Sequence, residues 1–327
     1  SALVTGNTVV IKPSSDTCWT VSLLVDCLRQ AGLPDGVVNL ATGPGSTLGN
    51  ALVESPDVSG ITFTGSYDVG MNLYYNHTNL KYVRPTILEL GGKNPTIISR
   101  HADVEDAALG TVRSAFGLQG QKCSAASRVY IEEPLYDKVV QRMVELTEKL
   151  AVGDPTERQV YLGPVINKKA YADYQSYVTD LAAAGTILTG GKQLKGGIYD
   201  KGYFCAPTIV ADVPRDHPLW KREMFLPITM VERVKDLDEA MQLANDTIYG
   251  LTAGFYGDPS EIDWFYDHIQ AGVVYANRPQ GTTTGARPGF QPFGGWKGSG
   301  SSGKNAGGLY YLPLYLHEQI RNTVRRA

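Results

Sequence analysis

The chain has 327 residues, of which 43% are hydrophobic and 19% charged, and it carries a formal net charge of −3. This length and apolar content allow a sizeable core and more than one domain, and the absence of a sustained basic stripe gives no electrostatic reason to expect a nucleic-acid partner. No apolar run reaches the roughly 20 residues that a membrane-spanning helix needs, and the first seven residues lack the charged and apolar regions of a signal peptide, so a cytoplasmic protein, or one of the mitochondrial matrix in a eukaryote, is expected.

The beginning of the chain alternates short apolar strands with helices. A strand is predicted at residues 8–11, a helix at 17–31 that ends in a Gly-Leu-Pro turn, and a second strand at 37–40. The alternation continues with a helix at 46–54 and a strand at 60–63. Short buried strands that alternate with helices are typical of a parallel sheet covered on both faces, so an α/β fold is predicted.

The same alternation restarts further along the chain. A strand is predicted at residues 96–98, a long helix at 104–118 and another strand at 128–131. A cysteine-containing loop lies between this helix and the last strand. The second part of the chain is therefore also predicted to be α/β.

Four short motifs occur along the chain, namely Phe63-Thr64-Gly65-Ser66, Glu89-Leu90-Gly91-Gly92-Lys93, Gly120-Gln121-Lys122-Cys123-Ser124-Ala125 and Pro292-Phe293-Gly294-Gly295-Trp296. The third places a cysteine beside a lysine, and a nearby cation or free backbone N–H groups lower the pKa of a thiol. A lone cysteine is more often a small buried hydrophobe. Together, however, the four motifs resemble the aldehyde dehydrogenase superfamily, in that family's order and over nearly the whole chain.

Two segments narrow the resemblance within this superfamily. Residues 116–125 and Thr284-Gly285-Ala286 are most similar to the glutamate-semialdehyde (1-pyrroline-5-carboxylate) dehydrogenases. This resemblance implies oxidation of L-glutamate γ-semialdehyde to glutamate with NAD, or with NADP, in proline or arginine breakdown. Another semialdehyde or an aliphatic aldehyde is the alternative substrate. A non-catalytic truncated module is the alternative from a different functional class.

The resemblance implies two catalytic residues. Cys123 would add to the aldehyde as the nucleophile and, after hydride transfer, would carry a thioester. Glu89 would be the general base that activates the water for hydrolysis. Its place between the apolar pair Ile87-Leu88 and Leu90 also argues against an ordinary solvated carboxylate. The backbone N–H of Cys123 would help to hold the oxyanion.

The resemblance also implies cofactor contacts. Lys12 would meet the adenine ribose, and Gly45 and Gly49, in a glycine turn that opens a helix, would face the pyrophosphate. The remaining expected contacts are Thr64, Gly65, Ser66, Leu90, Glu223 and Phe225. Leu226 replaces the family's usual glycine, and Ser15 stands where NAD-preferring members often carry a glutamate. The choice between NAD and NADP is therefore left open.

For the substrate, Ser124, Gly285 and Ala286 match a hydroxyl and two backbone N–H groups that hold an α-carboxylate in the glutamate-semialdehyde dehydrogenases. Phe116 and Phe293 would flank the aliphatic part of the aldehyde. A plain turn and two core aromatics would produce the same pattern, because apolar residues line pockets and cores alike.

The same resemblance divides the chain into a partial Rossmann-like dinucleotide-binding domain at 1–89, a catalytic domain at 90–306, and an oligomerisation strand and tail at 307–327. The apolar run at 310–316 is expected to pair with another copy in a homo-oligomer. Relatives carry a substantial upstream segment, so the sequence is expected to be a fragment. Its four cysteines are too sparse for a disulfide framework and lack metal-ligand spacing, which predicts free thiols and no metal.

Overall fold

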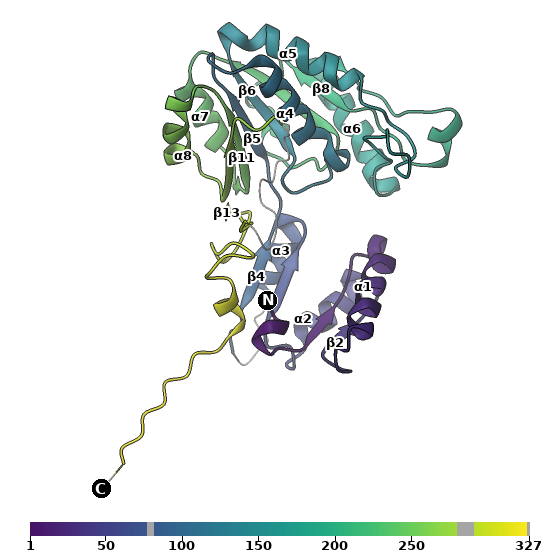
Figure 1. Cartoon of the computed structure of the whole chain (residues 1–327). Helices are drawn as coiled ribbons and strands as arrows, with labels where there is room; N and C mark the ends of the chain where they lie inside the picture. The colour runs from purple at the N-terminus through teal and green to yellow at the C-terminus, as the bar shows by residue number, and fades with distance from the viewer. Residues whose placement is uncertain (77–81, 280–290, 326–327) are drawn as a thin grey trace.

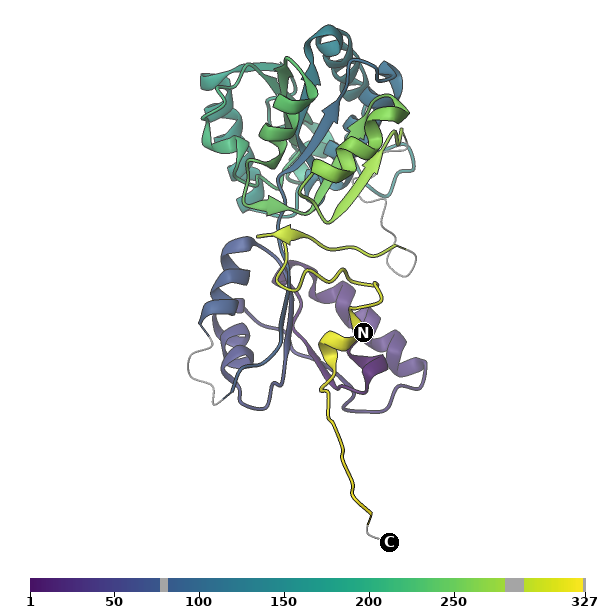
Figure 2. The ribbon, with the colours of Figure 1, turned by 90° about the vertical axis from the view of Figure 1, so that its left-hand side faces the viewer.

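The computed structural model describes residues 1–76, 82–279 and 291–325. Figures 1 and 2 both show a smaller lobe formed by the beginning of the chain and a larger lobe formed by its middle. The C-terminal segment, drawn in yellow, returns from the larger lobe and runs along the smaller one.

The smaller lobe contains β1 (Val9–Ile11), α1 (Cys18–Gln30), β2 (Val38–Leu40), α2 (Asn50–Glu54), β3 (Ile61–Thr64), α3 (Tyr67–Tyr75) and β4 (Thr86–Glu89). Strand β1 pairs with β2, and β3 pairs with β4, both in parallel. Each helix follows a strand, which is the alternation that the sequence predicts. Within residues 1–76 only Pro13 and Gly70 are buried, so these two-stranded sheets enclose almost no core of their own.

The larger lobe contains β5 (Asn94–Ile98), α4 (Val104–Phe116), β6 (Ala126–Glu132), α5 (Glu133–Glu148), α6 (Lys168–Ala184), β7 (Thr186–Thr189), β8 (Thr208–Ala211), β9 (Ile228–Val234), α7 (Leu237–Asn245), β10 (Tyr249–Gly250), β11 (Thr252–Tyr256), α8 (Ile262–His268) and β12 (Val273–Ala276). Seven strands form one sheet in the order β12-β11-β5-β6-β9-β8-β7. All neighbouring strands in it are parallel except β7 and β8.

Helices cover both faces of this sheet. Neighbouring residues of a strand point to opposite faces, and Ile97 and Ile98 of β5 accordingly belong to two different hydrophobic clusters. The cluster of Ile97 includes side chains of α6, α7 and α8, and that of Ile98 includes side chains of α4 and α5. Burial on both faces explains why β5 is a continuous buried run rather than an alternating one. The α/β fold predicted from the sequence is confirmed.

The C-terminal segment connects the two lobes. Strand β13 (Trp296–Lys297) pairs antiparallel with β10 of the larger lobe. Just beyond it, the backbone O of Ser299 accepts the Leu90 N–H at 2.9 Å, and Oγ of Ser301 accepts the Leu88 N–H at 2.9 Å. The chain therefore crosses back to β4 within a few residues.

The strand expected within residues 310–316 is wrong. Leu312–Tyr315 form a 3₁₀ helix, since Pro313 has no N–H to give to a ladder. The rings of Tyr311 and Tyr315 pack edge to face with centroids 5.5 Å apart, and the Tyr315 hydroxyl lies 3.1 Å from Oγ1 of Thr62. Tyr311 is buried and Tyr315 is half-buried, whereas Tyr310, Leu312 and Leu316 are exposed. None of the helices in the described ranges is long and apolar enough to cross a membrane.

Candidate functional site

The two expected catalytic residues lie where the lobes meet. Glu89 is the last residue of β4, and Cys123 lies in the loop between α4 and β6. Glu223 precedes β9. Both carboxylates act electrostatically on the Cys123 thiol, so the structure brings the three side chains together at the amino-terminal edge of the large sheet.

The glycine pair that follows Glu89 packs between Glu223 and Cys123. Oε1 of Glu223 accepts the Gly92 N–H at 3.0 Å. A Cβ on Gly91 would overlap the Glu223 carboxylate, and a Cβ on Gly92 would overlap the backbone O of Cys123. Only glycines allow this close approach, which explains the Gly-Gly sequence of the motif.

The Cys123 thiol is not activated in this structure. Its pKa is raised to about 11, chiefly by burial and also by the Glu223 and Glu89 carboxylates, while its own backbone N–H and Lys122 oppose the rise. The adjacent lysine lowers this pKa as expected, but two carboxylates and desolvation outweigh one cation, so the net shift is upward. Formation of the thiolate requires a base or a change in the surroundings of the thiol.

Glu89 has the properties of such a base. Burial raises the pKa of its carboxyl group to about 7, and Oε2 is buried without a hydrogen-bond partner in the part of the chain that the structure describes. A carboxyl group that titrates near neutral pH both accepts and releases protons readily. Glu89 is accordingly suited to acid–base chemistry.

The turn before Cys123 needs unusual backbone angles. Leu118, Gln119 and Gly120 have φ values of 52°, 58° and 64°, and a Cβ on Gly120 would overlap the backbone O of Leu226. Gly120 is therefore required both for its left-handed φ and for this contact. Leu226, which replaces the glycine expected from the family, is itself buried behind this turn.

Among the expected cofactor residues, Lys12 and the glycine turn lie together. Nζ of Lys12 donates to the backbone O of Pro13 at 2.6 Å and of Gly43 at 3.4 Å. Gly45–Gly49 form a π-helical turn that leads directly into α2. Ser15 is exposed nearby on the 3₁₀ turn that precedes α1.

The second group of expected cofactor residues lies around β3 and β4. Thr64 ends β3, the Gly65 N–H donates to the backbone O of Glu89 at 3.1 Å, and Ser66 is the N-cap residue of α3 without a side-chain capping bond. Leu90 is buried against Gly70 of α3. Its side chain therefore offers no accessible surface to a cofactor.

Phe225, unlike Leu90, has a side chain that is accessible to a cofactor. It has a left-handed φ of 55°, and its side chain is 43% exposed beside Glu223. An exposed aromatic ring next to a carboxylate can pack against a planar heterocycle.

The expected substrate residues are only partly placed as predicted. Phe116 is fully buried in the cluster with α4 and α5, which contradicts a substrate contact because core side chains enclose it. Ser124 directly follows the nucleophile and is 2% exposed. Phe293 is half-buried, and its backbone pairs with that of Ala306. Gly285 and Ala286 lie outside the described residues.

Three polar residues at this edge were missed from the sequence, namely Lys93, Asn94 and Thr252. Lys93 is fully buried, and the pKa of its ammonium group is lowered to about 7, chiefly by burial and also by Arg128, with Glu223 opposing. The sequence contains one signal for Asn94, since asparagine is disfavoured in strands and yet opens the buried strand Asn94–Ile98. Among the described residues, no group of three His, Cys, Asp or Glu side chains is arranged to hold a metal ion.

Known proteins show what this chain is similar to. Its sequence matches the aldehyde dehydrogenase family over residues 1–320. It is 43% identical to the 1-pyrroline-5-carboxylate dehydrogenase of Bacillus cytotoxicus over 99% of this chain and 62% of that protein. It is 41% identical to 1-pyrroline-5-carboxylate dehydrogenase 2 of Halalkalibacterium halodurans over 96% of this chain and 60% of that protein.

A solved structure agrees with these sequence matches. The crystal structure of 1-pyrroline-5-carboxylate dehydrogenase from Thermus with bound NAD superposes with a TM-score of 0.88 at 40% identity. The match covers 95% of this chain and 60% of that one. The chain thus spans about three-fifths of the length of these relatives.

Proposed function

The chain belongs to the aldehyde dehydrogenase family, and from this membership we propose that it oxidises L-glutamate γ-semialdehyde to glutamate with NAD or NADP. The observation that carries the proposal is the convergence of Cys123 and Glu89 at the edge of the large sheet, with the Glu89 carboxyl titrating at a pKa of about 7. The names of the relatives from Bacillus cytotoxicus and Halalkalibacterium halodurans support the choice of substrate.

In the proposed reaction Glu89 acts twice. It first accepts the proton of the Cys123 thiol, whose pKa of about 11 prevents spontaneous ionisation near neutral pH. The sulfur then bonds to the aldehyde carbon, and the backbone N–H of Cys123 donates to the oxyanion. Glu89 releases that proton to solvent before hydride loss leaves a thioester. It then accepts a proton from water, hydroxide adds to the thioester carbon, and the Cys123 sulfur leaves with the proton that Glu89 returns.

The residues present fit a nicotinamide dinucleotide, which would supply the hydride acceptor. Lys12 lies over the Gly45–Gly49 turn, and Ser66 lies at the N-terminus of α3, where backbone N–H groups favour phosphate. At the other end, the Glu223 carboxylate would accept from ribose hydroxyls and the exposed Phe225 ring would pack on the nicotinamide. The Thermus relative was solved with bound NAD.

For the substrate carboxylate, we retain Ser124 together with Gly285 and Ala286 as the proposed donors, and Phe293 as the flanking aromatic. Neutral donors suit a carboxylate. Phe116 is not retained, because it is buried in the core. We also propose that the chain assembles into a homo-oligomer. Because Leu312–Tyr315 form a 3₁₀ helix, this assembly does not rest on a strand at residues 310–316.

A second candidate is a folded module without turnover. The near absence of buried residues in positions 1–76 favours it, because a cofactor site on such a lobe would be weakly organised. Calorimetric titration with NAD and with NADP separates the two candidates. Binding at micromolar to millimolar concentration supports the dehydrogenase, and no binding at millimolar concentration supports the module.

The substrate is tested by the rate of NADH or NADPH formation with glutamate γ-semialdehyde and with an uncharged aldehyde of similar length. Cys123→Ala serves as the control without the nucleophile. A preference for the charged aldehyde that disappears in this control supports the proposal. Equal rates for both aldehydes would leave only the family assignment.

A further inference from the structure

The side chain of Asn94 makes hydrogen bonds at this site in addition to the backbone pairing of its strand. It opens β5, is 3% exposed, and is followed by Pro95, which has no backbone N–H. The register between β5 and β6 shifts between these two residues. The regular backbone pairing between β5 and β6 is therefore interrupted here, and the Asn94 side-chain amide makes the hydrogen bonds to the neighbouring backbone.

Both donors of this amide hold the cysteine loop. Nδ2 donates to the backbone O of Cys123 at 2.8 Å and to that of Ala125 at 2.9 Å. Oδ1 accepts the Thr252 N–H of β11 at 3.0 Å. Asn94 thus connects the loop on one side to the central sheet on the other.

Thr252 completes the arrangement. Its Oγ1 donates to the backbone O of Ser124 at 3.3 Å. Three successive carbonyl groups, those of Cys123, Ser124 and Ala125, are therefore held by two side chains of the sheet. The Ala125 N–H closes the loop on the backbone O of Lys122 at 3.2 Å.

We propose that Asn94 is a positioning residue for Cys123: by holding the carbonyl groups of Cys123 and Ala125, it fixes the direction of the thiol and of the Cys123 N–H. The proposal rests on the proposed function, in which Cys123 is the nucleophile. Fixed reacting groups matter because small displacements of a nucleophile cost large factors in rate.

Release of the loop should make the thiol more accessible to solvent and yet lower the rate at which it reacts with the bound aldehyde. Three charged groups from different elements act on the thiol: Glu89 of β4, Glu223 before β9, and Lys122 of the loop itself. If the loop moves towards solvent, burial and both carboxylates weaken together, and the pKa of the thiol falls towards its ordinary value.

The test is alkylation of Cys123 by iodoacetamide as a function of pH, with peptide mapping to separate it from the other three cysteines. Asn94→Ser removes both amide donors and leaves one shorter hydroxyl. We expect the pH midpoint for Cys123 to fall by about one unit or more, while kcat for aldehyde oxidation falls about tenfold or more and the KM for NAD stays unchanged. A folded Asn94→Ser variant with the parent midpoint would overturn the proposal.

Asn277→Ser is the matched control. The Asn277 amide also bonds the backbone, at Gly257 with distances of 2.9 and 3.0 Å, but at the end of β12. It should leave the Cys123 midpoint unchanged even if it lowers the melting temperature. A shift equal to that of Asn94→Ser would show that general loosening is the cause and would overturn the proposal.

Asn94→Thr decides the question if Asn94→Ser does not fold. Its β-branched side chain suits a strand, and like serine it offers one hydroxyl in place of the amide. A fall of the midpoint supports the proposal, and no fall overturns it. Because alkylation needs no turnover, absent dehydrogenase activity with a shifted midpoint would refute the proposed function and leave the role of Asn94 intact.

Discussion

The backbone N–H of Gly92 donates to Oε1 of Glu223 at 3.0 Å, while the α-carbon of the same glycine faces the backbone O of Cys123. Gly92 therefore lies between Glu223, the proposed cofactor-binding carboxylate, and Cys123, the proposed nucleophile. Because the packing leaves no room for a Cβ between Gly92 and the backbone O of Cys123, the separation between the two groups is set by the backbone of Gly92.

Gly91→Ala should weaken cofactor binding without unfolding the protein. The new Cβ would overlap the end of the Glu223 side chain, which can rotate away, so the carboxylate rather than the backbone is displaced. We expect the Kd for NAD to rise about tenfold, the loss of one hydrogen-bonded charged contact. Isothermal titration measures it, with Gly60→Ala, where the Cβ meets only ordinary contacts, as the control. An unchanged Kd would remove Glu223 from the cofactor site.

Glu89→Gln should change how stability depends on pH. The folded pKa of about 7 lies above the ordinary value of 4.5, so the folded state binds more protons than the unfolded state between these pH values. Stability contributed by Glu89 is therefore present below pH 4.5 and is lost as the pH rises to about 7. Urea unfolding at both ends of this window should show a loss of roughly 1 to 3 kcal/mol in the parent that is absent in the variant. The exposed Glu157→Gln should reproduce the parent.

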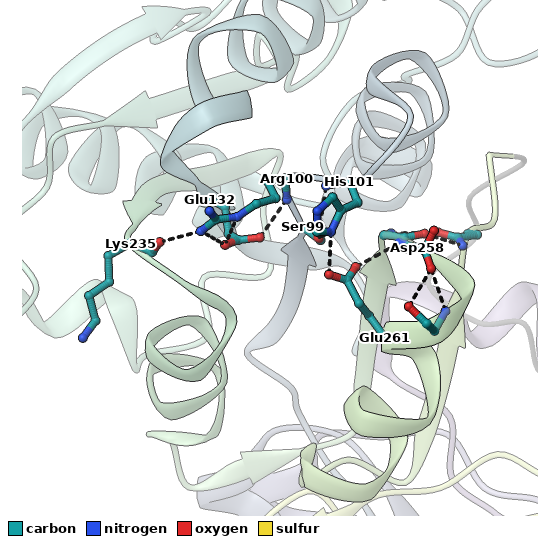
Figure 3. A network of polar contacts seen from close by, with 10 residues as sticks. Ser99, Arg100, His101, Glu132, Lys235, Asp258 and Glu261 are labelled. Atoms are coloured by element: carbon teal, nitrogen blue, oxygen red, sulfur yellow. Dashed lines mark hydrogen bonds and ion pairs between the residues drawn. The ribbon is translucent and has the colours of Figure 1, made fainter.

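Glu132→Ala should destabilise the protein without affecting the candidate site. Figure 3 shows Glu132 at the end of β6 holding Arg100, and the separate contact between His101 and Glu261. The Glu132 side chain is 3% exposed, and its carboxylate accepts the Arg100 N–H at 2.7 Å and Nε–H at 2.8 Å. Because the Arg100 side chain is 42% exposed and can be hydrated once its partner is gone, we expect a cost of about 1.5 to 3 kcal/mol for the lost hydrogen bonds to a charged group.

Urea unfolding checks this cost. Asp173→Ala, which removes the exposed pair with Lys169, should cost no more than about 1 kcal/mol. Alkylation of Cys123 should be unchanged in both variants, because Glu132 lies at the carboxyl edge of the sheet and Cys123 precedes the amino end of β6. A Glu132→Ala variant as stable as the parent would show that the ion pair contributes nothing.

Ser124→Ala should select against a charged aldehyde. Hydrogen bonds to charged groups are worth about 1.5 to 3 kcal/mol, so kcat/KM for glutamate γ-semialdehyde should fall about tenfold or more. An uncharged aldehyde of similar length should be oxidised as before. Equal losses for both would mean that the nearly buried hydroxyl of Ser124 supports the loop and does not bind the substrate carboxylate.

The alternation of apolar runs and helices predicted the fold because strand and helix periodicities are local properties. The strand β6 and the helix α4 lie within a few residues of the predicted ranges. The run at 310–316 was misjudged because its apolar content fits both an edge strand and a packed turn, and the contact with Thr62 that decides between them is distant in sequence.

The sequence pointed to Cys123 and Glu89, which the fold brings together, but it did not predict the electrostatics around them. Motifs identify Cys123 and Glu89, whereas the pKa of a thiol depends on which carboxylates fold against it. Glu223 lies a hundred positions further along the chain and outweighs the adjacent Lys122. Asn94 escaped notice because its importance arises from bonds to a loop and a strand that only the fold brings together.

Trapping the reaction on Cys123 tests the central claim most directly. The Glu89→Gln variant is incubated with NAD and glutamate γ-semialdehyde, quenched in acid, and mapped by mass spectrometry. Without Glu89 the thiol loses its proton only to solvent, so NADH should form slowly. The account predicts that the peptide containing Cys123 gains one glutamyl group only when both compounds are present, in an amount equal to the NADH, because the thioester that forms is not hydrolysed. NADH formed with Cys123 unmodified, or a glutamyl group on another cysteine, would contradict it.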